Sequence, residues 1–133
     1  MCLRRLYMSK NTKKIILVVE DEIDILLVLH DRLQVEGFEM LKAKNGEEAL
    51  ALSLKEHPDL ILLDLLMPLM DGISMLKKLR EDAWGKTANV MILSNLSGEE
   101  KMKEAEALGV TDYLIKVDWK IEDIIEKIKG KII

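Results

Sequence analysis

Short runs of consecutive apolar residues alternate with amphipathic stretches along most of the chain. Four runs are apolar throughout, at residues 15–19, 60–63, 90–93 and 113–115. A strand with both faces buried has this pattern, so the runs predict central or near-central strands of a parallel sheet. A fifth segment, "FEMLKAK" from Phe38, mixes apolar and charged residues. It predicts an edge strand with one face partly exposed to water.

Apolar residues at helical spacing fill the segments between these runs and follow the last one. They are Leu26, Leu29 and Leu33; Leu50 and Leu54; Ile73, Leu76 and Leu79; and Ile121, Ile124, Ile125 and Ile128. A further helix is predicted to open with a capping box at Ser97–Glu100 and to stop at Gly109. Strand and helix therefore alternate. This alternation predicts an α/β fold, a doubly wound, five-stranded parallel sheet with helices on both faces. For such a sheet we expect the common strand order 2-1-3-4-5.

The composition is that of one globular domain. The chain has 133 residues, of which 49% are hydrophobic, and its net charge of -4 offers no basic surface for nucleic acid. No stretch reaches the roughly 18 consecutive apolar residues of a membrane span, so no membrane contact is expected. The single cysteine, Cys2, fits a reducing compartment, and we expect a cytoplasmic protein. The expected divisions are a flexible N-terminal extension at 1–13, the folded domain at 14–129 and a C-terminal tail at 130–133.

Polar residues follow directly after four of the predicted strands. Glu20 and Asp21 follow the first strand, Asp64 the third, Ser94 the fourth and Lys116 the last. Taken one at a time, each has a structural explanation as a helix cap, a turn residue or a solvated strand end. However, the carboxyl ends of parallel strands meet at one edge of the sheet, and ligands bind there. Together these residues predict a functional site at that edge.

The residue types in this cluster suit the transfer of a phosphoryl group to a carboxylate. In the order 2-1-3-4-5 the first and third strands are neighbours, so Asp21 and Asp64 would face each other with Glu20 beside them. Packed carboxylates repel, and a hard divalent cation such as Mg²⁺ would offset the repulsion while leaving room for a phosphate oxygen. Lys116 would supply a second positive charge and Ser94 a hydroxyl. Asp64 could then act as a nucleophile toward phosphorus.

The chain resembles the receiver domain of two-component response regulators over residues 14–129. The resemblance rests on four segments in this order: "ILVVEDE", "DLILLDLLMPLMDG", "VMILSN" and "DYLIK". It implies a flavodoxin-like fold with Asp64 as the phosphoacceptor. The other implied roles are Asp21 as a direct Mg²⁺ ligand, Glu20 as an acidic residue acting through water, Leu66 as a metal ligand through its backbone carbonyl, Ser94 as the hydroxyl that follows the phosphoryl group, Lys116 as the family's lysine, and Tyr113 as the aromatic switch.

The same resemblance implies partners for the chain. The phosphodonor would be a phosphohistidine on a sensor histidine kinase or on a phosphotransfer protein. Only one helix can follow Lys116, so we expect a single-domain regulator without an output domain of its own. It would signal to a downstream effector protein through the face formed by the fourth helix, fifth strand and fifth helix. We therefore expect a signalling switch and not an enzyme.

Two other functions stay open at this point. A Mg²⁺-dependent phosphatase of the haloacid-dehalogenase kind also uses an aspartyl nucleophile, but it carries Asp-x-Asp-x-Thr after the first strand, and residues 20–24 read EDEID. A degenerate receiver would bind partners without being phosphorylated. The presence of Asp21, Asp64, Ser94 and Lys116 argues against this second alternative.

Three positions depart from the commonest pattern of the family. Glu20 stands where aspartate is more frequent, and Asn95 stands where alanine or glycine is usual, so that its amide either narrows access to the site or holds a water. Val117 stands where proline is usual. A cis bond before a residue other than proline costs about 3–4 kcal/mol, so we predict a trans bond between Lys116 and Val117. Two positions that flank the acyl phosphate in this family are apolar here, Leu66 and Leu96.

Overall fold

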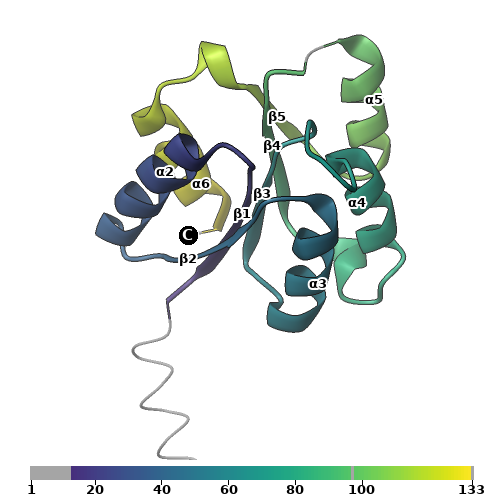
Figure 1. Cartoon of the computed structure of the whole chain (residues 1–133), viewed down its shortest axis with the longest axis horizontal. Helices are drawn as coiled ribbons and strands as arrows, with labels where there is room; N and C mark the ends of the chain where they lie inside the picture. The colour runs from purple at the N-terminus through teal and green to yellow at the C-terminus, as the bar shows by residue number, and fades with distance from the viewer. Residues whose placement is uncertain (1–12, 97, 133) are drawn as a thin grey trace, which may run out of the picture.

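The fold is a five-stranded parallel sheet with helices on both faces (Figure 1). The computed structural model describes residues 13–96 and 98–132. The strands are β1 (Ile15–Val19), β2 (Glu39–Ala43), β3 (Leu60–Leu63), β4 (Val90–Ser94) and β5 (Asp112–Ile115). They pair in the order β2-β1-β3-β4-β5, and every pair is parallel. The predicted fold class and strand order are confirmed.

Within residues 13–96 and 98–132, five α-helices and two short 3-10 turns connect and cover the strands. They are α2 (Ile23–Val35), α3 (Gly46–Glu56), α4 (Gly72–Arg80), the turn η1 (Gly85–Thr87), α5 (Glu99–Ala107), the turn η2 (Lys116–Asp118) and α6 (Ile121–Ile132). In Figure 1, α2 and α6 lie on one face of the sheet, whereas α3, α4 and α5 lie on the other. This is the doubly wound arrangement that right-handed crossovers produce.

Alternate residues of each central strand point into two separate hydrophobic cores. In β3, Ile61 and Leu63 belong to the core beneath α3, α4 and α5, and Leu60 and Leu62 belong to the core beneath α2 and α6. All four are at most 2% exposed. Burying each such side chain stabilises the fold by about 1.5–3 kcal/mol. β3 is therefore held rigidly on both faces up to the residue that precedes Asp64.

The apolar run at residues 113–115 predicts a central or near-central strand, and this prediction is wrong. β5 is an outer strand that pairs only with β4, and among its four residues only Leu114 is buried. A run of three apolar residues is too short to distinguish continuous burial from the alternation of an edge strand. The other outer strand is β2, as predicted from its mixture of apolar and charged residues.

The predicted helix through Leu50 and Leu54 is present as α3, but its buried face consists of small residues. They are Gly46, Ala49 and Ser53. Leu54 is 38% exposed. The N–H of Gly46 donates to the carbonyl of Met70 at 2.9 Å, and a Cβ on Gly46 would collide with that carbonyl. The start of α3 thus lies too close to the loop before α4 for large side chains to fill this contact.

The end of α5 follows the sequence-based prediction. Gly109 has a φ of +84°, and the N–H of Val110 donates to the carbonyl of Ala105 at 3.0 Å. Glycine adopts this left-handed conformation without strain, so it ends the helix. The helix begins at Glu99. The predicted capping residue, Ser97, lies outside the described residues.

The two ends of the chain differ in what the structure describes. Of the predicted extension at 1–13, only Lys13 is among the described residues. Residues 130–132, expected as part of a tail, continue α6, because Ile132 packs against the core beneath α2 and α6. Within the ranges 13–96 and 98–132, no helix combines the length and the apolar character needed to cross a membrane.

Arg80, the last residue of α4, connects three segments through backbone carbonyls. Its Nε donates to Leu108 at 2.8 Å, and its Nη1 donates to Gly85 at 2.7 Å and to Ala88 at 2.8 Å. Burial lowers the pKa of this guanidinium. The carbonyl oxygens, including one at the carboxyl end of α5, offset part of that desolvation cost. Arg80 therefore holds α4, the η1 turn and the end of α5 together.

Replacing Arg80 with methionine should lower the free energy of unfolding by about 2–4 kcal/mol, because partly buried carbonyls lose charged donors. Urea denaturation would measure the change. Arg32→Met is the matched control, since Arg32 forms an exposed ion pair with Glu122 at 3.1 Å, and a pair of this kind contributes little to stability. Equal losses in the two variants would contradict this account of Arg80.

Candidate functional site

Three carboxylates meet at the carboxyl ends of β1 and β3. Glu20 and Asp21 follow β1, Asp64 follows β3, and the last residues of these neighbouring strands, Val19 and Leu63, are register partners. One carboxylate oxygen from each of the three acids lies within 4.8 Å of the others. Glu20 and Asp64 are buried, whereas Asp21 is exposed. An oxygen-rich group that is open to solvent on one side fits a hard divalent cation.

Both carboxylate oxygens of Asp64 have partners, although the residue is only 5% exposed. The hydroxyl of Ser94 donates to Oδ1 at 2.6 Å, and the backbone N–H of Leu66 donates to the same oxygen at 3.3 Å. The amine of Lys116 lies 3.1 Å from Oδ2. These contacts offset the desolvation of a charge at the end of a buried strand. Ser94 comes from β4 and Lys116 follows β5, so the ends of four strands meet at this site.

Lys116 contacts acidic residues from two segments of the chain. Its amine lies 2.5 Å from Oε1 of Glu20 and 3.6 Å from Oε1 of Glu22, in addition to its contact with Asp64. Burial lowers the pKa of Lys116, but the hydrogen bond to Glu20 and the charges of Asp64 and Glu20 outweigh burial, so the pKa is raised overall. Lys116 is therefore charged at neutral pH and can offset added negative charge beside Asp64.

The carboxylate of Glu20 is held in an unfavourable environment. Burial raises the pKa of Glu20, the hydrogen bond from Lys116 opposes part of that increase, and the charge of Asp64 adds to it. The N–H of Glu22 also donates to Glu20 at 3.2 Å. The raised pKa means that ionising Glu20 costs folding free energy at neutral pH. A cation bound between the carboxylates would remove part of this cost.

The loop between β3 and α4 folds tightly over Asp64. A Cβ on Gly72 would lie 2.5 Å from the carbonyl oxygen of Asp64 and 2.8 Å from the Cα of Leu65, so only glycine allows α4 to begin this close to the end of β3. Leu66 directs its N–H to Asp64, and its side chain is 56% exposed. The role of the Leu66 carbonyl as a metal ligand stays a prediction.

Tyr113 is connected to Ser94 through the loop after β4. The Tyr113 hydroxyl donates to the carbonyl of Leu96 at 2.5 Å, and the N–H of Leu96 donates to the hydroxyl oxygen of Ser94 at 3.2 Å. Burial raises the pKa of Tyr113, and the charge of Asp64 adds to this increase. A change in the position of Ser94 can therefore be transmitted to Tyr113. The switch role of these two residues stays a prediction.

Two contacts near the site are absent from the sequence-based prediction. One is the approach of Glu22 to Lys116. The other is a hydrogen bond in which Oδ1 of Asn95 accepts from the backbone N–H of Val117 at 3.2 Å. The amide of Asn95 is thus directed toward the chain after Lys116. The sequence does contain a signal for the second contact. Asn95 and Val117, both unusual in the family, directly follow the site residues Ser94 and Lys116.

The bond between Lys116 and Val117 is trans, as predicted. Throughout the part of the chain that the structure describes, no peptide bond is cis. The absence of proline at position 117 is consistent with this geometry, because the cis form is costly without it.

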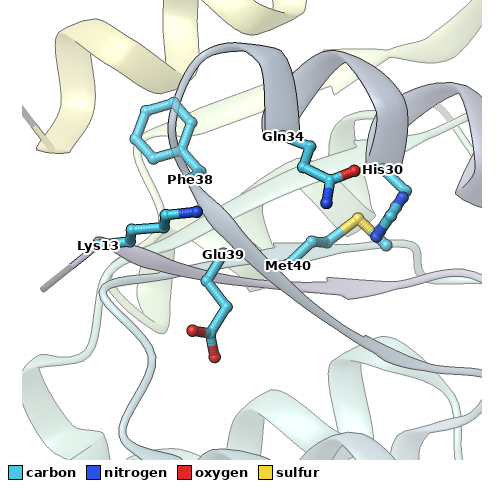
Figure 2. Close-up of a pocket in the computed structure, with 6 residues that line it drawn as sticks. All are labelled: Lys13, His30, Gln34, Phe38, Glu39 and Met40. Atoms are coloured by element: carbon cyan, nitrogen blue, oxygen red, sulfur yellow. The ribbon is translucent and has the colours of Figure 1, made fainter. Parts of the chain in front are cut away.

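Figure 2 shows a pocket lined by residues of α2, the start of β2 and the residues just before β1 and β2. Its lining residues are Lys13, His30, Gln34, Phe38, Glu39 and Met40. Lys13, Phe38 and Glu39 lie at the amino ends of β1 and β2, whereas the acidic cluster lies at the carboxyl ends of the strands. This pocket between α2 and β2 is therefore not part of the candidate site.

The raised pKa of Glu20 predicts how stability depends on pH. Below its ordinary pKa of 4.5 Glu20 is protonated in both states, and stability falls as the pH rises through the folded-state value. Glu20→Gln should reduce this loss when unfolding is measured with urea at several pH values in the presence of EDTA.

Asp112 provides a comparison with the opposite sign. The hydrogen bond from Lys131 lowers the pKa of Asp112, so its contribution is present above its ordinary pKa of 3.8 and is lost as the pH falls through the folded-state value. Asp112→Asn should remove that acid-sensitive contribution. If both substitutions changed the pH dependence in the same direction, the electrostatic account of Glu20 would be wrong.

Comparison with known proteins agrees with this geometry. The family model for the response regulator receiver domain matches residues 16–129. The transcriptional regulatory protein ResD of Bacillus subtilis is 40% identical over 111 residues, which are 82% of this chain and 44% of ResD. The chain spans less than half the length of the curated relatives it matches.

Solved structures with the same fold include the chemotaxis protein CheY4 of Vibrio cholerae. The TM-score is 0.82 at 30% identity, over 92% of this chain and 100% of that chain. The CheX–CheY–BeF₃–Mg²⁺ complex from Borrelia burgdorferi gives a TM-score of 0.80 at 26% identity, over 90% of both chains. With the family model covering most of its residues, the chain belongs to the response regulator receiver domain family.

Proposed function

We propose that this receiver accepts a phosphoryl group on Asp64 from a phosphohistidine of a sensor histidine kinase or a phosphotransfer protein. The observation that carries the proposal is the environment of Asp64, with a hydroxyl on one oxygen and an ammonium group on the other. Two more carboxylates lie beside it. A nucleophilic carboxylate needs a fixed position and nearby positive charge, because negative charge spreads over the phosphoryl oxygens during transfer.

The transfer exchanges one bond to phosphorus for another. An oxygen of Asp64 forms the new bond while the phosphorus–nitrogen bond of the phosphohistidine breaks, and the imidazole leaves with the electron pair and takes a proton from solvent. Lys116 would pair with the oxygens of the incoming group. The hydroxyl of Ser94, which donates to Asp64 in this structure, would turn to donate to a phosphoryl oxygen.

Mg²⁺ is the metal that this donor set fits best among the common hard cations that bind with phosphate. Asp21 and Asp64 would bind it directly, Glu20 through water, and Leu66 through its backbone carbonyl. When bound, Mg²⁺ would offset the repulsion between the carboxylates and the phosphoryl group. The Borrelia burgdorferi complex contains Mg²⁺ together with BeF₃, which supports the assignment by analogy.

We propose that the phosphorylated form signals to an effector protein through the face formed by α5, β5 and α6. Support comes from the hydrogen bonds that link Ser94 to Tyr113 through Leu96, because Tyr113 lies on β5. The net charge of -4 favours a protein as the immediate partner over nucleic acid. On this proposal the chain is a switch. Its output depends on an effector protein binding to the face formed by α5, β5 and α6, and not on turnover of a substrate.

Incubation with acetyl phosphate and Mg²⁺, followed by intact mass measurement, tests the proposed function. We expect one labile phosphoryl group on the wild-type chain and none on Asp64→Asn. Steady release of phosphate without retained label would indicate a phosphatase. No uptake by a folded wild-type chain would indicate a receiver that works without phosphorylation.

The metal ligands should differ in their importance. Asp21→Ala should weaken Mg²⁺ binding by on the order of 100-fold and Glu20→Ala by on the order of 10-fold, because a direct ligand is lost only in the first variant. Isothermal titration calorimetry would measure both. Asp31→Ala, an equal change of charge on the exposed side of α2, is the control. A greater loss for Glu20→Ala would reverse the assigned roles.

The phosphorylated form should be long-lived, because the two positions that flank the acyl phosphate in this family carry apolar side chains here. Neither Leu66 nor Leu96 can orient a water by hydrogen bonding, and both can exclude water from Asp64. Leu66→Asn or Leu96→Glu should speed loss of the phosphoryl group about five- to thirty-fold, which corresponds to about 1–2 kcal/mol in the barrier. Loss of label at fixed Mg²⁺ would be followed by mass.

Leu69→Asn is the matched control for this series. Leu69 belongs to the same loop as Leu66, is 79% exposed and has a left-handed φ of 67° that asparagine tolerates. It should leave the lifetime unchanged. If the Leu66 and Leu96 variants behave like Leu69→Asn, water exclusion is not what controls the lifetime.

A further inference from the structure

The two unusual residues beside the site, Asn95 and Val117, contact each other. Oδ1 of Asn95 accepts from the backbone N–H of Val117 at 3.2 Å. Asn95 directly follows Ser94, which holds Oδ1 of Asp64, and Val117 directly follows Lys116, which holds Oδ2. The hydrogen bond therefore completes a closed path of contacts. The path runs from Oδ1 of Asp64 through Ser94 and Asn95, and returns through Val117 and Lys116 to Oδ2 of Asp64.

The backbone N–H of Val117 has its partner outside its own turn. Val117 lies in the η2 turn, which is closed by a hydrogen bond from the N–H of Trp119 to the carbonyl of Lys116 at 3.3 Å. The first N–H groups of such a turn have no acceptor within it. Proline at this position would carry no N–H. Valine introduces the donor, and Asn95 supplies the acceptor, so the two departures from the family pattern compensate each other.

The bond also continues the connection between β4 and β5 beyond the end of their ladder. The last register pair is Ser94 with Ile115. Past this pair the two segments separate into loops, and the hydrogen bond between Asn95 and Val117 joins them again next to Lys116. The hydroxyl of Tyr113 joins the same loop after β4 at Leu96. Of these two connections, only the one made by Asn95 reaches the turn that carries Lys116.

We propose that Asn95 is a positioning residue for phosphoryl transfer, which holds the turn carrying Lys116 against the end of β4. Lys116 and Ser94 are then kept on the same carboxylate when the phosphodonor arrives. The proposal rests on the proposed function of Asp64 as phosphoacceptor. Asn95 acts through Val117 and Lys116, because its Oδ1 is engaged by the backbone of Val117 and not by Asp64.

Asn95→Ala should slow phosphorylation by acetyl phosphate about three- to tenfold, the effect of losing one hydrogen bond that holds a reacting group. The Mg²⁺ affinity should change by less than about twofold, because the substitution leaves the three carboxylates in place and keeps the charge of Lys116. This split distinguishes positioning of Lys116 from general damage to the site. Asn95 is exposed and Val117 is 79% exposed, so neither change removes core packing.

Two further variants make the test specific. Asn89→Ala is the matched control. Asn89 lies just before the amino end of β4, away from the carboxylates, and its side chain also bonds a backbone group, the carbonyl of Asp59. It should phosphorylate at the wild-type rate. In a Val117→Pro background, which lacks the N–H donor, Asn95→Ala should have less than about a twofold further effect.

The outcomes separate this inference from the proposed function. A wild-type chain that takes up no phosphoryl group overturns the proposed function and the inference together. If the wild type is phosphorylated and Asn95→Ala matches its rate, the inference alone is overturned. Equal slowing by Asn95→Ala with and without Val117→Pro also overturns it, because Asn95 would then act by a route other than the Val117 N–H.

Discussion

The ion pair between Asp64 and Lys116 is the interaction on which the rest of the site depends. Asp64 extends a strand whose four residues are buried on both faces, so its charge cannot be left without partners. Lys116 supplies the opposite charge from the end of β5, and Ser94 supplies a hydroxyl from the end of β4. The parallel order of β3, β4 and β5 is what brings these two groups to one carboxylate.

The same arrangement carries an electrostatic cost that the two hydrophobic cores offset. Glu20 is buried beside Asp64, and its pKa is raised mainly by that burial. Lys116 compensates for only part of the negative charge, since it faces carboxylates from Glu20, Glu22 and Asp64 at once. Because the site has an excess of negative charge, a bound cation would stabilise it more than it would stabilise a neutral pocket.

The sequence predicts the fold well, because continuous apolar runs such as residues 60–63 have few alternatives to a buried parallel strand. The sequence also predicts where the carboxylates of the candidate site meet. The parallel topology alone brings Glu20, Asp21 and Asp64 together at the carboxyl ends of β1 and β3. The predicted strand order already puts β5 at the edge of the sheet, but three apolar residues did not show that only Leu114 among its residues is buried. The small-residue face of α3 was not predictable either, because it depends on a close contact between Gly46 and a loop distant in sequence.

The contact between Asn95 and Val117 shows a different limit of sequence reasoning. Each residue on its own suggests only a small departure from the family pattern, one in side-chain size and one in backbone geometry. Their relation becomes visible when the acceptor on one and the donor on the other are found 3.2 Å apart.

Trapping the acyl phosphate tests the central claim most directly. After incubation with acetyl phosphate and Mg²⁺, borohydride reduction converts a phosphorylated aspartate to homoserine, which peptide mass spectrometry can locate. The account predicts homoserine at position 64 and at no other aspartate. Homoserine at Asp21, or at an aspartate outside the cluster, would contradict the claim that the contacts of Asp64 with Ser94 and Lys116 select the phosphoacceptor.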